Sequence, residues 1–172
     1  MTVRPAGDED AEAIELVRIE TWRTTYRGLV ADAILDGMTV NADARRAQIR
    51  SRPAGQFLFV ATDDDGRVVG FAAGGPERTG DPDYRGEVYA IYVLPAHQGR
   101  GHGRALIRES VRALAAAGLD SLLIWVLREN TIGRGFYERL GGGPIREKPL
   151  EMRGLEDQIE VAYAWRDTAA LR

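Results

Sequence analysis

The sequence predicts one α/β domain of the α+β type, with a mixed, mostly antiparallel central sheet flanked by helices. The expected elements follow the order β-α-α-β-β-β-α-β-α-β-β, and no linker, repeat or low-complexity segment interrupts them. The length of 172 residues suits a single hydrophobic core, so we expect residues 1–172 to form one domain. The apolar and charged fractions, 44% and 28%, are those of a soluble globular protein.

The first part of the chain predicts one strand and two helices. The strand is expected at Thr2–Ala6, and the first helix then begins at Asp8 and runs to about Trp22. Asp8 is a suitable N-cap because its carboxylate can accept hydrogen bonds from the free amide groups of the first turn. A second helix is expected near Asp43–Arg50.

The centre of the chain predicts a hairpin and a strong strand. Two β-rich runs within residues 56–75 flank Asp65-Gly66, a dipeptide that favours a tight turn. Residues Gly86–Leu94 are rich in β-branched and aromatic side chains, and Pro95 ends this strand.

The last third predicts alternating strands and helices. The continuous apolar run Ser121–Leu127 is typical of a strand that is buried on both faces. In the helix expected near 131–140, the spacing of Ile132, Phe136 and Leu140 predicts the buried face. The remaining expected elements are a helix at 100–117 and strands at 145–152 and 160–165.

Charge and hydropathy exclude several classes of partner. The net charge of −3 offers no broad positive surface, so we expect no nucleic-acid partner. No apolar run approaches the ~18 residues of a membrane span, and we expect no membrane partner. The first ten residues, MTVRPAGDED, lack the apolar region of a signal peptide, which favours a cytoplasmic location.

The residue types that are missing limit the chemistry. The chain contains no cysteine, which excludes disulfides, thiolate metal ligands and a cysteine nucleophile. It has two histidines, His97 and His102, so a multi-histidine metal centre is not expected. The available groups are carboxylates, phenols, hydroxyls and the backbone, together with a bound co-substrate.

The stretch HQGRGHGRALI, His97 to Ile107, is a glycine-rich loop between an expected strand and an expected helix. Such a loop is typical of a phosphate-binding site. A P-loop requires Lys and then Ser or Thr after its last glycine, but Arg104 and Ala105 follow Gly103. The dinucleotide fingerprint G-x-G-x-x-G also fails, because Arg104 occupies its sixth position counted from Gly99.

A third pattern, Q-x-x-G-x-G, fits residue for residue at Gln98, Gly101 and Gly103. With its strand and helix, and with the downstream segment NTIGRGFYERLGG, this loop resembles the signature motifs of the GNAT superfamily, the acetyl-CoA-dependent N-acetyltransferases. The resemblance covers residues 86–142 by motif and the whole chain by element order. One departure is Gly133, where the family usually has Ala; it should loosen its helix by about 0.5–1 kcal/mol.

The resemblance implies acetyl-CoA as co-substrate and a V-shaped splay between the strands at 86–94 and 121–128. The loop backbone is expected to hold the pyrophosphate, and a backbone N–H near Val93 to stabilise the oxyanion. Asn130 is expected either to contact the pantetheine arm or to cap its helix. The cofactor-binding candidates are Ile91, Tyr92, Val93, Gln98, Gly99, Arg100, Gly101, His102, Gly103, Arg104, Asn130 and Tyr137.

Two residues are the catalytic candidates. Tyr137, the tyrosine of the Phe-Tyr pair, is expected to be the general acid to the departing thiolate, as the resemblance implies. Glu87 precedes Gln98 by eleven positions, a spacing similar to that of the catalytic glutamate in the histone-acetyltransferase branch. We expect Glu87 to act as the general base through a water molecule. Without a cysteine for a thiol acyl-enzyme, we expect direct attack within a ternary complex.

Four aromatic residues are the acceptor-site candidates: Trp22, Tyr26, Tyr89 and Trp125. An aromatic wall suits a small amine with apolar or cationic character, although Trp22 could equally pack the first helix on the sheet. The sequence therefore predicts acetylation of a small-molecule amine. It is also compatible with a homodimer. The alternatives are acetylation of a peptide or protein amine, and a catalytically silent acyl-CoA-binding sensor or interaction module.

Overall fold

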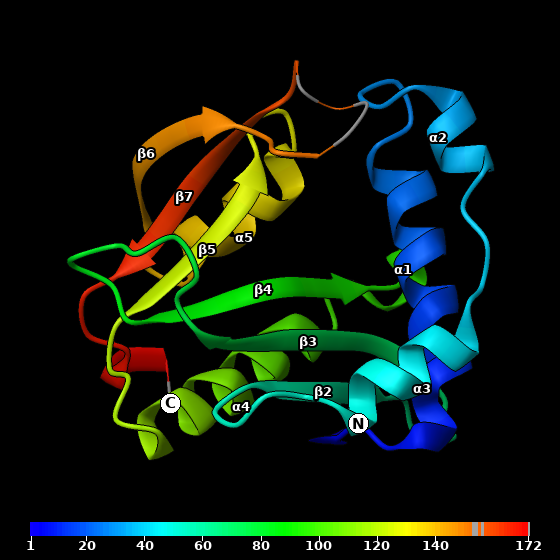
Figure 1. The fold of residues 1–172 in the computed structure, drawn as a ribbon, viewed down its shortest axis with the longest axis horizontal. Helices are drawn as coiled ribbons and strands as arrows, with labels where there is room; N and C mark the ends of the chain where they lie inside the picture. The colour runs from blue at the N-terminus through cyan, green and yellow to red at the C-terminus, as the bar shows by residue number, and fades with distance from the viewer. Residues whose placement is uncertain (153–154, 156, 172) are drawn as a thin grey trace.

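The computed structural model describes residues 1–152, 155 and 157–171. The strands of this part of the chain form one seven-stranded sheet in the order β1-β2-β3-β4-β5-β7-β6 (Figure 1). Neighbouring strands are antiparallel except for β4 and β5, which run parallel, so the expected mixed, mostly antiparallel sheet is confirmed. The bounds are β1 (Thr2–Pro5), β2 (Phe57–Thr62), β3 (Val68–Pro76), β4 (Gly86–Val93), β5 (Leu122–Leu127), β6 (Gly143–Pro149) and β7 (Ile159–Trp165).

Helices cover both faces of this sheet. Phe71 on β3 packs with Ile14 and Val17 of the first helix, whereas its neighbour Ala72 packs with Leu106 of the fourth. Because successive strand residues point to opposite faces, the first and fourth helices lie on opposite sides. The bounds are α1 (Ala11–Thr25), α2 (Asp32–Asp36), α3 (Ala42–Arg50), α4 (His102–Ala116) and α5 (Thr131–Arg139).

The expected V-shaped splay lies between β4 and β5. These strands pair through Gly86 with Leu122 and Glu87 with Leu123, and then diverge (Figure 1). Within the described residues, the divergence leaves the inner edges of both strands without a backbone partner over most of their length. It creates the space in which the candidate site is found.

Several helix and strand ends differ from those expected. Asp8 does not cap α1 but begins a separate 3-10 turn, and α1 starts at Ala11. The reason is Asp10, whose carboxylate accepts a hydrogen bond from the amide of Gly7 at 2.9 Å and so holds the preceding turn together. In addition, α4 starts at His102 rather than Arg100, β6 spans 143–149 rather than 145–152, and the short helix α2 was not expected.

Ile132 was expected on the buried face of α5, and this is wrong. Its side chain is 68% exposed at the mouth of the cleft described below. The inward position belongs instead to Gly133, where an added Cβ would lie 3.1 Å from Val126 Cγ2. The helix therefore approaches β5 closely on its Gly133 side, a contact that the apolar spacing alone could not indicate.

None of the helices in the described residues is both long enough and apolar enough to span a bilayer.

Candidate active site

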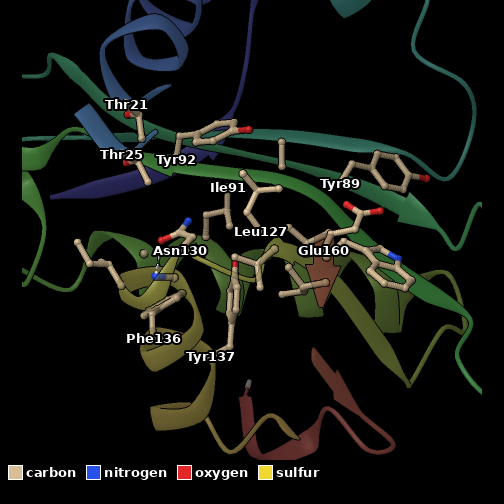
Figure 2. Close-up of a pocket in the computed structure, with 18 of the residues that line it drawn as sticks. Thr21, Thr25, Tyr89, Ile91, Tyr92, Leu127, Asn130, Phe136, Tyr137 and Glu160 are labelled. Atoms are coloured by element: carbon tan, nitrogen blue, oxygen red, sulfur yellow. Dashed lines mark hydrogen bonds between the residues drawn. The ribbon is translucent and has the colours of Figure 1, made fainter. Parts of the chain in front are cut away.

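A cleft of about 1120 Å³ opens between the diverging strands β4 and β5 (Figure 2). One end is formed by the glycine loop and α5, and the other by side chains of β4, β5, β6 and β7. A cleft of this volume lies just above the usual range of about 300–1,000 Å³ for small-molecule sites, and it has room for a large ligand beside a small one.

The glycine loop has a backbone that favours glycine at two positions. Gly99 and Gly101 have φ of +72° and +89°, and Gly101 is the N-cap residue of α4. The side-chain amide of Gln98 donates a hydrogen bond from Nε2 to the backbone carbonyl of Val93 at 3.0 Å, which ties the loop to the end of β4. The free amide groups of the first helical turn, with the positive end of the helix dipole, form a site for an anionic group.

Gly103 is required for a different reason. A Cβ on this residue would lie 3.2 Å from Cζ of Phe136, so the first turn of α4 lies close against α5. This contact brings the two helix N-termini to the same end of the cleft.

The structure brings most of the cofactor-binding candidates together, but not all of them. Arg100 and His102 are not among the residues that line the cleft. The side chain of Tyr92 points to the α1 side, where its hydroxyl accepts a hydrogen bond from Trp22 Nε1 at 3.0 Å. The candidates that line the cleft are Ile91, Tyr92, Val93, Gln98, Gly99, Gly101, Gly103, Arg104, Asn130 and Tyr137.

His102 is buried beneath the loop instead. Its ring lies 5.9 Å from that of His97, and its Nδ1 is buried with no hydrogen-bond partner among the described residues. Burial is the largest cause that lowers the pKa of His102, and the nearby His97 lowers it further. The neutral ring therefore acts as a packing element of the loop.

Tyr137 on α5 is 5% exposed, and its hydroxyl points into the cleft (Figure 2). Its ring packs against Tyr163 and Trp165, with ring centroids 5.7 Å and 6.3 Å away. Burial raises the pKa of the Tyr137 phenol well above its usual value. The phenol thus keeps its proton at neutral pH and is available as a donor.

Asn130 caps α5, which is one of the two roles expected for it. Its Oδ1 accepts a hydrogen bond from the amide of Gly133 at 2.9 Å. Burial is the largest cause that raises the pKa of Tyr26, which lies at the end of α1, well above its usual value. Asn130 and Tyr26 both line the cleft, one from the start of α5 and the other from the end of α1.

Glu87 is a buried ion-pair partner. Its side chain is 2% exposed, and Arg78 holds both carboxylate oxygens, with Nη2 2.6 Å from Oε1 and Nε 3.1 Å from Oε2. The backbone amide of Arg78 donates a third hydrogen bond, at 3.2 Å. These three hydrogen bonds hold the Glu87 carboxylate in one orientation.

Glu160 on β7 is a functional candidate that sequence reasoning missed. Its carboxylate lines the cleft, and its side chain is 13% exposed (Figure 2). Burial is the largest cause that raises its pKa; the ion pair with Lys148 lowers it, and the charge of Glu87 raises it again. The alternation Glu160, Ala162, Ala164 places a carboxylate on the face with the smallest side chains of β7, a signal that could have identified it.

The four aromatic acceptor candidates all line the cleft, but in two groups. Trp22 and Tyr26 pack edge to face with centroids 5.0 Å apart, and Tyr26 belongs to a core cluster with Leu127. Tyr89 and Trp125 lie at the other end, and each ring faces a cation. The first pair therefore forms a wall of the cleft, while the second pair forms its polar end.

No group of three or more His, Asp or Glu side chains in the described part of the chain is arranged to hold a metal ion.

Comparisons with known proteins agree with this geometry. Residues 18–142 match the model of the acetyltransferase (GNAT) family. The uncharacterized N-acetyltransferase YuaI of Bacillus subtilis is 34% identical over 172 residues, which is 100% of this chain and 96% of that protein. The mycothiol acetyltransferase of Rhodococcus erythropolis is 39% identical over 102 residues, but these cover 58% of this chain and 33% of that protein. Among solved structures, YncA of Salmonella typhimurium, a putative acetyltransferase with acetyl-CoA, has a TM-score of 0.69 at 26% identity over 95% of this chain and 92% of that one.

Proposed function

The chain belongs to the GNAT acetyltransferase family, and we propose that it transfers the acetyl group of acetyl-CoA to the amine of a small molecule by direct attack within a ternary complex. The observation that carries this proposal is one cleft that joins the glycine loop to the Tyr137 hydroxyl and the Glu160 carboxylate. Because the cleft combines residues from α1 to β7, we treat residues 1–172 as one catalytic unit.

The loop fits the pyrophosphate of acetyl-CoA. Gly99 and Gly101 leave open space at the loop, since no atom lies within 4 Å of a Cβ placed on either residue. The amides of this loop would bind the pyrophosphate, and Arg104 at its edge would add a charged hydrogen bond. The bound co-substrate supplies an activated thioester, which its pantetheine arm would place between β4 and β5.

Proton transfer is divided among three side chains in this proposal. Tyr137 donates its proton to the leaving thiolate, which its buried phenol is suited to do. Glu87 is one candidate to accept the proton of the amine, through a water molecule, as the sequence suggested. Glu160 is a second candidate for the base, and its raised pKa favours it because a general base works best with a pKa near the working pH.

The polar end of the cleft supports a cationic amine as the acceptor. It combines the Glu160 carboxylate with the ring of Trp125, and the present partner of both is the flexible side chain of Lys148. The other carboxylate and ring, those of Glu87 and Tyr89, are held by Arg78. A carboxylate beside an aromatic face is the environment that attracts an ammonium group. This favours diamines and other amines that keep a second positive charge over purely apolar amines.

Two measurements test the proposal. Thermal shift with acetyl-CoA, ATP and NAD should show stabilisation by acetyl-CoA, about 2.7 kcal/mol at 100 times its dissociation constant. A panel of small amines, amino acids and peptides should then release free CoA with a diamine or polyamine. Binding of acetyl-CoA without CoA release for any amine would favour the silent sensor, and release with peptides alone would favour a protein acceptor. Parallel double-reciprocal plots would contradict direct attack.

A further inference from the structure

Lys148 on β6 is the only lysine in the chain, and it lines the polar end of the cleft. We propose that Lys148 is a self-acetylation site: its ε-amine enters the acceptor position of the same chain and takes the acetyl group from bound acetyl-CoA. This inference rests on the proposed acetyl-CoA-dependent activity, and it adds a product that is the protein itself.

The contacts of Lys148 are those of a bound substrate amine. Its Nζ lies 3.3 Å from Oε1 of Glu160 and 4.5 Å from the ring centroid of Trp125. A carboxylate and an aromatic face are the two groups that bind an ammonium in a recognition site. Lys148 thus occupies the position that a cationic acceptor would use, while its backbone remains in β6.

The side chain can reach further into the cleft. Lys148 is paired across the strands with Glu160, and Glu160 with Leu127, so two strand spacings of about 4.8 Å separate Lys148 from β5. The side chains of directly paired residues share one face, which turns Lys148 toward the same side as Leu127. Tyr137 and Leu127 both line this cleft. Lys148 is 32% exposed and has a flexible four-carbon stem, so its amine can leave Glu160 and move along the cleft.

The reaction balances with the groups present in the cleft. The ammonium of Lys148 gives a proton to the Glu160 carboxylate, and the neutral Nζ forms a bond to the carbonyl carbon of the acetyl group. The carbon–sulfur bond breaks, and CoA leaves as a thiol with the proton of Tyr137. The phenol regains its proton from the second proton of the attacking nitrogen through water. The products are an amide on Lys148 and free CoA.

Acetylation would change the acceptor site electrostatically. The amide carries no charge, so the ion pair with Glu160 and the cation–π contact with Trp125 would both be lost. Lys148 is the one lysine among the 23 Lys and Arg residues of the sequence. The rest are arginines, which stay protonated and are not acetylated. Among the side chains, the modification is therefore confined to Lys148.

The test is mass spectrometry of the full chain after incubation with acetyl-CoA alone. One acetyl group per chain is expected on the peptide that contains Lys148, and Lys148→Arg should remove it while preserving the positive charge. A reference lysine comes from Arg112→Lys, a position on α4 that is 56% exposed, outside the cleft and therefore more accessible than Lys148. That lysine should stay unmodified, because chemical acetylation would favour the more exposed amine.

Two rates complete the experiment. Tyr137→Phe should slow the modification at least tenfold while a thermal shift still reports bound acetyl-CoA. The rate per chain should not change with protein concentration, because each chain modifies itself. Equal modification of Lys148 and the lysine of Arg112→Lys, or a rate that rises with protein concentration, would overturn the proposal.

The outcome is separable from that of the proposed function. A protein that acetylates a small amine but leaves Lys148 unmodified at saturating acetyl-CoA disproves self-acetylation and leaves the proposed function intact. A protein that acetylates Lys148 but none of the amines in the panel supports the inference and contradicts the small-molecule acceptor.

Discussion

Glu87 and Arg78 form a two-pronged ion pair at the closed end of the V, with Nη2 2.6 Å from Oε1 and Nε 3.1 Å from Oε2. Glu160 has a different partner, a lysine 3.3 Å away. An Arg–carboxylate fork is stronger and more rigid than a single Lys contact. The two glutamates of the cleft therefore differ in how tightly their carboxylates are held.

We expect Glu160→Gln to lower kcat by about 10²-fold, the lower end of the usual loss when a general base is removed. The loss in Glu87→Gln should be smaller. The base must be deprotonated, and the pKa of Glu160 is raised by burial. Activity of the wild type should thus fall on acidification at a pH above the ~4.3 of an ordinary glutamate. The pH profile of kcat for both variants decides the assignment. If Glu87→Gln instead removes the acidic limb of the profile, Glu87 is the base.

Tyr137→Phe should reduce kcat by about 10²-fold or more and leave the KM for acetyl-CoA nearly unchanged, because it removes only the proton donor. Tyr163→Phe is the matched control from the same aromatic cluster. The hydroxyl of Tyr163 donates to Glu138 Oε1 at 2.6 Å, and Tyr163 does not line the cleft. The control should cost stability without loss of kcat. Equal turnover of Tyr137→Phe and wild type would remove the acid role.

Gly101→Val should raise the KM for acetyl-CoA sharply, because valine does not tolerate a φ of +89° and the loop backbone would have to change. Gly66→Val is the control, since Gly66 has a φ of +81° in the turn between β2 and β3 and does not line the cleft. Both variants should lose stability in a melting experiment, but only Gly101→Val should lose affinity for acetyl-CoA. Unchanged affinity would show that the loop is only a turn.

Arg104→Ala should weaken acetyl-CoA binding by about 1.5–3 kcal/mol, the scale of a hydrogen bond to a charged group, or ~10–150-fold in affinity. The KM for the amine should stay unchanged, because Arg104 lies at the loop end of the cleft. Arg100→Ala is the matched control, since Arg100 does not line the cleft. An equal loss in both variants would indicate a general charge effect instead of a direct contact.

His102→Gln should flatten the pH dependence of stability below pH ~6.5. The pKa of His102 is lowered in the folded state, so between the folded and unfolded pKa values the unfolded chain binds the extra proton. The wild type should therefore lose stability as the pH falls through the unfolded value of ~6.5. Melting temperatures of both proteins from pH 7.5 to 5.5 test this, and parallel curves would contradict it.

The sequence alone was sufficient for the elements whose signals are local. Strand β4, the glycine loop and helix α4 follow from alternation, from glycine spacing and from one amphipathic stripe, each of which depends on neighbouring residues. The family motifs lie in this same segment and in α5, which is why most of the cofactor-binding candidates named from the sequence line the cleft. Asn130 was expected in one of two roles, and its capping bond to Gly133 lies within a single turn.

The acceptor end was decided by the tertiary structure. Glu160 and Lys148 come from strands at the far side of the sheet, and only the order β5-β7-β6 brings them beside Trp125. The ion pair of Glu87 likewise depends on the path of the chain after β3, which brings Arg78 beside Glu87 and which no local pattern specifies. Whether a carboxylate is a solvated strand end, a buried ion-pair partner or a base with a raised pKa depends on burial and on neighbouring charges. Both depend on residues that are distant in the chain, so they are decided when the sheet assembles.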